Sequence, residues 1–193
     1  MLRRIYHWTL DLATHKHAVA ALALVSFVES SIFPIPPDVI LIPMILAARD
    51  RAWAIAGMCT VASVLGGMVG YVIGALVFDQ IGKPILDFYN YSPKFKEFTE
   101  TYNNWGAWAV FFAGVTPFPY KVITILSGAT KLDFMVFSIS SLLARGLRFF
   151  IVAALLWQFG DSIREFVERR LGFLFFSFVI LLLVGFLLAK LVL

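Results

Sequence analysis

The stretch SIFPIPPDVI (residues 31–40) places three prolines and an aspartate between two apolar segments. Proline removes a backbone donor and restricts the residue before it, so Pro34, Pro36 and Pro37 predict a break in any helix at this point. The flanking apolar segments are 18–33 and 38–48. Each is shorter than a helix that crosses a hydrocarbon core, which needs about 20 residues. They therefore predict two half-helices that enter the membrane and return to the same side, a re-entrant hairpin over residues 18–48.

The composition places the chain among integral membrane proteins, because 61% of its 193 residues are hydrophobic and only 15% are charged. Longer apolar segments predict membrane-spanning helices at residues 52–79, 133–160 and 171–192. Residues 1–17 carry apolar side chains along one helical face and predict a helix that lies in the membrane surface. The net charge of +4 then needs no nucleic-acid partner, since basic residues commonly flank membrane spans.

A second break is predicted at Pro117 and Pro119, within a hairpin over residues 104–130. In both breaks the motif is Pro-x-Pro, and a charged residue follows two positions later, Asp38 in the first and Lys121 in the second. This similarity predicts a diverged repeat of a hairpin and a spanning helix. The single membrane domain then consists of a surface helix at 1–17, repeat one at 18–82, an external amphipathic connector at 83–103, repeat two at 104–160, and a C-terminal spanning helix at 171–192.

The two repeats are expected to be inverted, because one spanning helix separates hairpins that each enter and leave on one side. The distribution of basic residues predicts a cytoplasmic N-terminus, since arginine and lysine are enriched in cytoplasmic loops. The predicted cytoplasmic set is Arg3, Arg4, Lys16, Arg49, Arg51, Arg164, Arg169 and Arg170, and the opposite set is Lys83, Lys94, Lys96, Lys131 and Lys190.

Five ionisable residues are expected to meet where the hairpins approach each other near the middle of the bilayer. Glu29 lies near the carboxyl end of a half-helix, where the helix dipole and the low dielectric both oppose a negative charge. It must therefore be protonated or paired with a cation, and we interpret Glu29 and Asp38 as proton- or ion-coupling residues. An alternative role for Asp38 is to cap its half-helix.

Lys121, Arg145 and Arg148 are the cations of this predicted site. Arginines in the middle of a spanning helix are costly when they face lipid, so Arg145 and Arg148 must face inward. Three cations against two acids leave one positive charge, which favours binding of a phosphate headgroup, with pure internal pairing as the alternative. Gly66, Gly67, Gly70 and Gly74 predict close packing of the hairpins against the first spanning helix.

Catalysis is not expected. His7, His15 and His17 lie at the N-terminal surface, away from the breaks, and no nucleophile is paired with a base. No His, Cys or Asp grouping has metal-ligand spacing, and the single Cys59 excludes an intramolecular disulfide. The sequence therefore predicts neither a metal nor another cofactor.

These features resemble the DedA family of membrane proteins, also called the VTT or SNARE-associated Golgi protein family. FVESSIFPIPPDVILIP (27–43) is similar to the family's first signature, GGMVGYVIG (66–74) to its glycine-rich helix, and FFAGVTPFPYKVITILSGA (111–129) occupies the place of its second break. The resemblance covers residues 18–160. The chain departs from the family where arginines usually flank the second proline, because Gly114, Tyr120 and Lys121 stand there instead. We infer that Arg145 and Arg148 supply the missing cations in a divergent branch.

The resemblance implies a multi-pass protein of the bacterial inner membrane that translocates lipids with dependence on protons or membrane potential. Undecaprenyl phosphate and phosphatidylethanolamine are the candidate substrates. The expected partners are thus membrane lipids with a phosphate-bearing headgroup and protons, in a protein that could be a homo-oligomer. The alternatives are a proton-coupled carrier of a small ion and a non-transporting membrane assembly protein.

Overall fold

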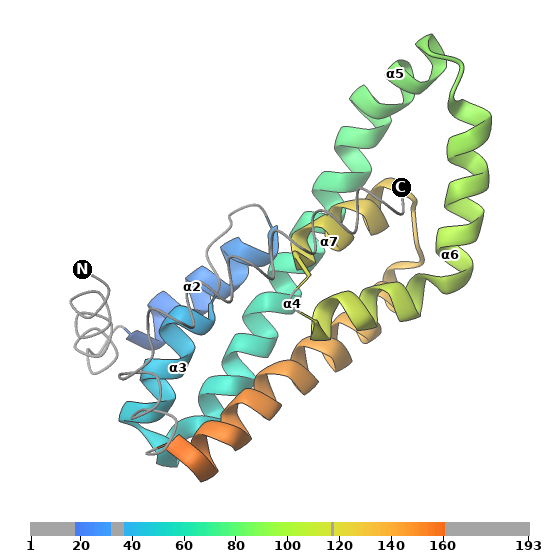
Figure 1. Ribbon diagram of the computed structural model, residues 1–193. Helices are drawn as coiled ribbons and strands as arrows, with labels where there is room; N and C mark the ends of the chain where they lie inside the picture. Colours follow the sequence, from blue (N-terminus) through green and yellow to red (C-terminus); the bar gives the residue numbers. More distant parts are fainter. Residues whose placement is uncertain (1–17, 32–36, 117, 161–193) are drawn as a thin grey trace, which may run out of the picture.

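The computed structural model describes residues 18–31, 37–116 and 118–160, and within these ranges the chain forms helices and no strand (Figure 1). The prediction of an all-helical protein is confirmed. The predicted surface helix 1–17, the spanning helix 171–192 and the break residues Pro34, Pro36 and Pro117 lie outside the described residues. In chain order the elements are α2 (Ala18–Ser31), α3 (Asp38–Ala47), η1 (Arg49–Arg51), α4 (Ala52–Val77), η2 (Phe78–Gly82), α5 (Lys83–Phe88), α6 (Ser92–Val115), α7 (Tyr120–Ala129) and the helix Phe134–Gly160.

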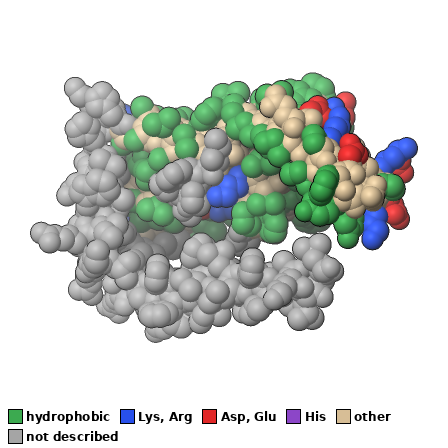
Figure 2. All heavy atoms as spheres, turned by 90° about the horizontal axis from the view of Figure 1, so that it is seen from above, with side chains coloured by type: hydrophobic (Ala, Val, Ile, Leu, Met, Phe, Trp, Pro, Cys, Tyr) green, Lys and Arg blue, Asp and Glu red, His purple; other side chains and the backbone are tan. Residues whose placement is uncertain are grey.

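Two of these helices are long and apolar enough to cross a membrane, Arg49–Phe88 and Phe134–Gly160. The first contains the segment 52–79 that the sequence assigns to a spanning helix, and the second covers the predicted segment 133–160 except for its first residue. Their outward side chains are large and apolar, for example Leu65, Leu76, Leu143 and Leu155, each about half exposed. Figure 2 shows the same pattern, since hydrophobic side chains dominate the described surface and most charged ones gather at one end. Such a surface is suited to lipid.

The first long helix is longer than a membrane is thick. Its 40 residues correspond to roughly 60 Å at 1.5 Å per residue, whereas a hydrocarbon core measures about 30 Å. A π-helical turn, η2, lies within it, and the helix continues through α5 to Phe88. Figure 1 shows α5 and the beginning of α6 extending together beyond the other helices. The chain reverses between them at Asn90, whose φ of 58° is typical of a tight turn.

The segment that the sequence divides into a connector (83–103) and a half-helix (104–115) is different in the structure. From Ser92 to Val115 the chain forms one uninterrupted helix, α6, with Pro93 in its first turn. No proline follows until position 117, and Gly106 packs closely against Leu132, so nothing in this stretch ends the helix. The helix ends only at Thr116, whose ψ of 168° is extended.

The remaining helices are short. Helices α2, α3 and α7 have 14, 10 and 10 residues, so each is shorter than a full crossing. Helix α2 ends before the first proline-rich stretch and α3 begins after it, and the second stretch separates α6 from α7. The interruptions therefore lie at the two places that the prolines indicate.

Helix α4 is the centre of the packing. Its glycines allow backbone-to-backbone contact with both α2 and α7, because a Cβ atom at Gly66 would overlap the carbonyl of Phe27 and one at Gly74 that of Ile125. The contact is mutual, since Gly128 of α7 lies equally close to the carbonyl of Tyr71 on α4. Gly67 and Gly70 leave room for the side chains of Tyr120 and Thr124 of α7. The stripe of small residues thus draws the ends of α2 and α7 onto one face of α4.

Candidate functional site

The candidate site lies where the end of α2, the beginning of α3 and the beginning of α7 meet α4 and the helix Phe134–Gly160. The proline breaks position this junction, because they place helix ends instead of helix middles against the long helices. Thr124 of α7 donates a hydrogen bond of 3.3 Å to the carbonyl of Ser30 on α2, so the two interrupted segments touch directly. The structure brings four of the five predicted ionisable residues together here, as two separate ion pairs.

Arg145 is the most deeply buried charged residue of the described chain, with 2% of its surface exposed. Its Nε donates to the Ser63 hydroxyl at 2.6 Å, and its Nη2 donates to Glu29 Oε2 at 3.4 Å. The rings of Tyr120 and Phe149 lie 4.9 Å and 4.6 Å from its guanidinium carbon. The guanidinium is therefore held by a carboxylate, a hydroxyl and two aromatic rings, an arrangement that stabilises a desolvated cation.

Two serines complete a closed ring of hydrogen bonds around this ion pair. The hydroxyls of Ser30 and Ser63 are 2.6 Å apart, and Ser30 also donates to Glu29 Oε2 at 3.2 Å. The ring thus runs from Glu29 through Ser30 and Ser63 to Arg145 and back to Glu29. The carboxylate receives donors from two sides, which lowers the free-energy cost of burying it.

The sequence-based interpretation missed both serines, although a signal is present. Ser26 and Ser30 lie four residues apart on α2, and Cys59 and Ser63 lie four apart on α4, so each pair occupies one helical face. In the structure Ser26 contacts Cys59 at 3.3 Å, one turn below the contact between Ser30 and Ser63. Matching small polar residues at this spacing on two apolar helices is the pattern that could have identified the contact.

Arg148 forms the second ion pair and links the two breaks. Its Nη2 lies 2.6 Å from Asp38 Oδ2, and its Nη1 donates to the carbonyl of Thr116 at 3.1 Å. Asp38 begins the half-helix after the first break, and Thr116 ends the helix before the second. Both side chains of the pair are 23% exposed, so Arg148 is more accessible than Arg145.

Lys121 is not brought into this network. It is partly buried in the first turn of α7, and it forms no ion pair with any residue of the described ranges. The site therefore contains two paired arginines, with one additional cation near the positive end of a half-helix. Pro37 and Pro119 flank the site, directly before α3 and α7.

Some polar atoms near the arginines have unused hydrogen-bonding capacity. The hydroxyls of Tyr120 and Ser141 adjoin one another, and neither completes a hydrogen bond of ordinary geometry with a residue that the structure describes. Asp38 Oδ1 is also buried and has no partner within the described part of the chain, although its other oxygen binds Arg148. These atoms can bind water or a polar group that enters the site. Among the described residues no cluster of three or more His, Cys, Asp or Glu side chains could hold a metal ion.

Ser63→Ala is expected to destabilise the protein by about 1–3 kcal/mol, because it leaves Arg145 Nε buried without an acceptor. Ser26→Ala is the matched control, since Ser26 is equally buried and its hydroxyl contacts the thiol of Cys59 instead of a charged group among the described residues. The midpoint of thermal unfolding in detergent should fall clearly further for Ser63→Ala than for Ser26→Ala. Equal midpoints would show that the hydroxyl of Ser63 does not support the arginine.

Comparison with known proteins gives a consistent result. The family model of the VTT domain matches residues 35–158, which is more than half of the chain. An uncharacterized protein of Haemophilus influenzae is 33% identical over 186 residues, with 96% of each chain covered. An uncharacterized protein of Histophilus somni is 34% identical over 186 residues, covering 96% of this chain and 97% of the relative.

A more distant relative, an uncharacterized protein of Methanocaldococcus jannaschii, is 28% identical over 127 residues, covering 65% of this chain and 75% of its own. No solved structure matches the chain. The matched region includes Asp38, both spanning helices and both arginines. The chain therefore belongs to the VTT domain, or DedA, family of membrane proteins, which is often linked to lipid transport.

Proposed function

We propose that the protein moves a lipid with a phosphate-bearing headgroup across the membrane, by passing the headgroup between the two breaks while the acyl chains stay in lipid. The observation that carries this proposal is the position of Arg148, which contacts Asp38 beside the first break and Thr116 beside the second. A guanidinium that is partly accessible and paired with a carboxylate can exchange that carboxylate for a phosphate oxygen.

The two arginines would then have different roles. Arg145 lies against two aromatic rings and its Nε is used by Ser63, so we assign it to positioning the site and neutralising Glu29. Arg148, together with Lys121, would contact the headgroup. This division refines the sequence-based hypothesis, in which all three cations bound phosphate.

Protons would balance the charge. When a phosphate replaces Asp38 at Arg148, the released carboxylate becomes a second buried anion unless it takes up a proton. Asp38 and Glu29 are therefore proposed to load and release protons during the cycle. The candidate lipids are undecaprenyl phosphate and phosphatidylethanolamine, which the family membership suggests.

The proposal includes an architecture in which the two hairpins are re-entrant and related as inverted repeats, so that the breaks enter from opposite leaflets of the bacterial inner membrane. The contact between α2 and α7 on one face of α4 supports this architecture. A cytoplasmic N-terminus is supported by the basic residues, since Arg49 and Arg51 begin the long helix, whereas Lys83 and Lys131 meet at Asp79 nearer its other end.

The test is lipid exchange in vesicles reconstituted with equal amounts of full-length protein. Labelled phosphatidylethanolamine or undecaprenyl phosphate is followed from one leaflet to the other for the wild type, Arg148→Gln and Arg51→Gln. Arg51 is the control, because it is highly exposed and pairs with its neighbour Asp50. Arg148→Gln is expected to slow exchange at least about tenfold, which corresponds to about 1.4 kcal/mol, whereas Arg51→Gln should not.

Equal exchange in all three proteins, with each running as a single folded species in size-exclusion chromatography, would refute the proposal. Ion flux without lipid exchange would favour the small-ion carrier instead. Exchange by the wild type should also respond to a pH difference across the vesicle membrane, and Glu29→Gln should lose that response.

A further inference from the structure

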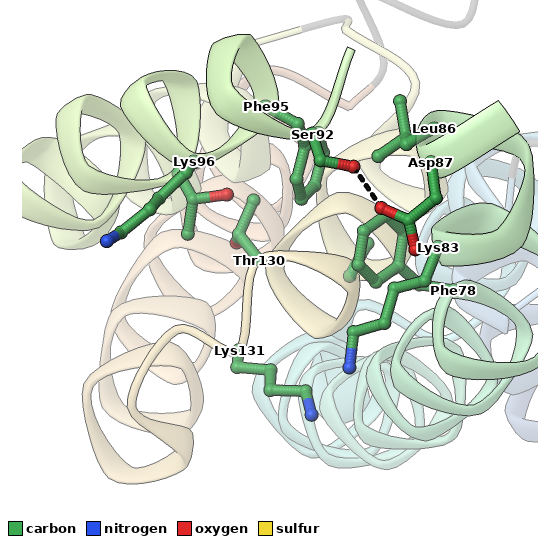
Figure 3. A pocket seen from close by; sticks show the side chains of 11 residues that line it. Phe78, Lys83, Leu86, Asp87, Ser92, Phe95, Lys96, Thr130 and Lys131 are labelled. Atoms are coloured by element: carbon green, nitrogen blue, oxygen red, sulfur yellow. Dashed lines mark hydrogen bonds between the residues drawn. The ribbon is translucent and has the colours of Figure 1, made fainter. Parts of the chain in front are cut away.

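A second polar site lies at the C-terminal end of α7, whereas Arg145 contacts its first residue, and the proposed transport mechanism does not use this site. A cavity of about 350 Å³ opens between α5, α6 and the end of α7 (Figure 3). Its volume falls within the range that is typical of small-molecule sites, about 300–1,000 Å³. The lining combines apolar and basic side chains: Phe78, Lys83, Leu86, Asp87, Ser92, Phe95, Lys96, Thr99, Ala129, Thr130 and Lys131.

Local backbone geometry creates this cavity. The π-helical turn of η2 begins at Phe78, whose ring stacks on that of Phe95 with centroids 4.5 Å apart, and the two rings form an apolar wall. Helix α7 ends at the cavity, where Lys131 adopts a φ of 52° and turns the chain away. A π-turn in a helix is frequently found at functional sites, because it offsets the side chains that follow it.

The charges around the cavity are predominantly positive. Lys83 Nζ and Lys131 Nζ lie 2.7 Å and 3.0 Å from the two oxygens of Asp79, so one carboxylate holds two ammonium groups near each other. Figure 3 shows the Lys83 and Lys131 side chains extending toward the same side, with Lys96 at the opposite edge. Lys96 has no ion-pair partner among the described residues, which leaves its charge available.

Neutral donors are also present. Thr99 lines the cavity, and its buried Oγ1 has no hydrogen-bond partner within the described part of the chain. The hydroxyl of Ser92 already donates a hydrogen bond of 2.5 Å to Asp87, so one carboxylate oxygen of this cavity-lining residue has a partner. With Asp79 included, three lysines face two aspartates, so the cavity combines a net positive charge with an apolar wall.

We propose that this cavity binds a phosphate group, either on a lipid headgroup or as a free phosphate compound. Each ammonium group has three donors, and Asp79 uses only one from each of its two lysines, so several donors remain for phosphate oxygens. The wall of Phe78 and Phe95 can contact an apolar or glycerol portion of the same molecule. The site is separate from the arginine pairs, and its existence does not depend on the transport proposal.

The proposal is tested by isothermal titration calorimetry of the full-length protein in detergent with dihexanoyl phosphatidylglycerol, glycerol 3-phosphate or inorganic phosphate. Lys96→Glu is expected to weaken binding about tenfold, because it replaces an attractive charge with a repulsive one. Asp79→Asn is expected to tighten binding, because it frees Lys83 and Lys131 from their carboxylate.

Lys94→Glu is the matched control. Lys94 lies two residues before Lys96 on α6 and carries the same charge. Its Nζ lies 5.2 Å from the centroid of the Tyr91 ring, and Lys94 does not line the cavity. The affinity of Lys94→Glu for the phosphate ligand should stay within about twofold of that of the wild type. Arg148→Gln should also leave the affinity unchanged, which separates this site from the arginine site.

Binding of phosphatidylglycerol but not of inorganic phosphate would support the proposal and assign the site to a lipid headgroup. Comparable binding of inorganic phosphate or glycerol 3-phosphate would support it and assign the site to a free phosphate compound. The proposal is overturned if none of the three ligands saturates the protein, if Lys94→Glu weakens binding as much as Lys96→Glu, or if only Arg148→Gln abolishes it.

Discussion

Gly74→Ala is expected to prevent the native packing of α4 and α7, although the change adds a single methyl group. The new Cβ atom would overlap the backbone carbonyl of Ile125, and a backbone atom cannot rotate away as a side chain can. Because Gly128 brings α7 equally close to Tyr71, the whole helix would have to move. Overpacking usually costs about 1–3 kcal/mol, and a rigid backbone contact is expected to exceed that range.

The matched control for Gly74→Ala is Gly57→Ala in the same helix. The nearest atom to a Cβ at Gly57 is Phe150 Cζ at 4.0 Å, which is an ordinary contact. In a helix interior alanine is favoured over glycine by about 1 kcal/mol, so Gly57→Ala should be neutral or stabilising. The midpoint of thermal unfolding in detergent should therefore fall for Gly74→Ala and stay unchanged or rise for Gly57→Ala. Equal midpoints would contradict the close backbone contact between α4 and α7.

Arg145→Met is expected to cause the second large loss, of about 3–5 kcal/mol in stability, because it leaves Glu29 as an unpaired carboxylate in a buried environment. Methionine has a similar length and can fill the space between Tyr120 and Phe149, so the loss reports on charge more than on volume. Arg145→Lys should restore only part of the stability, since an ammonium group lacks the planar set of donors with which the guanidinium binds Ser63 and Glu29.

A double-mutant cycle separates the ion pair from general damage. Glu29→Gln combined with Arg145→Met removes both charges, so this double variant should be more stable than Arg145→Met alone. The corresponding cycle for Asp38 and Arg148 should give a smaller coupling energy, because that pair is 23% exposed on each side. A double variant that is no more stable than Arg145→Met would show that Glu29 and Arg145 are not coupled.

Some of this architecture could be predicted from the sequence because proline acts locally. Pro37 and Pro119 lie directly before α3 and α7, where clustered prolines remove backbone donors, so the positions of the breaks follow from the sequence. A single proline is not sufficient, because Pro43 lies inside α3. The inward orientation of Arg145 and Arg148 was predictable for a similar reason, since a guanidinium in the middle of an apolar helix must find a polar partner.

The pairing of individual charges could not be predicted, because it depends on how the helices rotate and cross. The same five charges are compatible with several pairings, and the structure joins Glu29 to Arg145 and Asp38 to Arg148 while leaving Lys121 out. The continuous α6 was also missed. The polar composition indicated an external connector at 83–103 that is separate from the following hairpin, but composition does not end a helix when no breaker is present.

The two contacts of Arg148 have a mechanical consequence. One guanidinium donates hydrogen bonds to two residues that are 78 positions apart in the chain, Asp38 and Thr116. Both acceptors therefore compete with any incoming anion for the same few N–H donors. An anion that binds those donors would displace both Asp38 and the Thr116 carbonyl from Arg148. In the proposed transport cycle, movements beside the first break and beside the second would then be linked through a single side chain, without a long relay of intermediate residues.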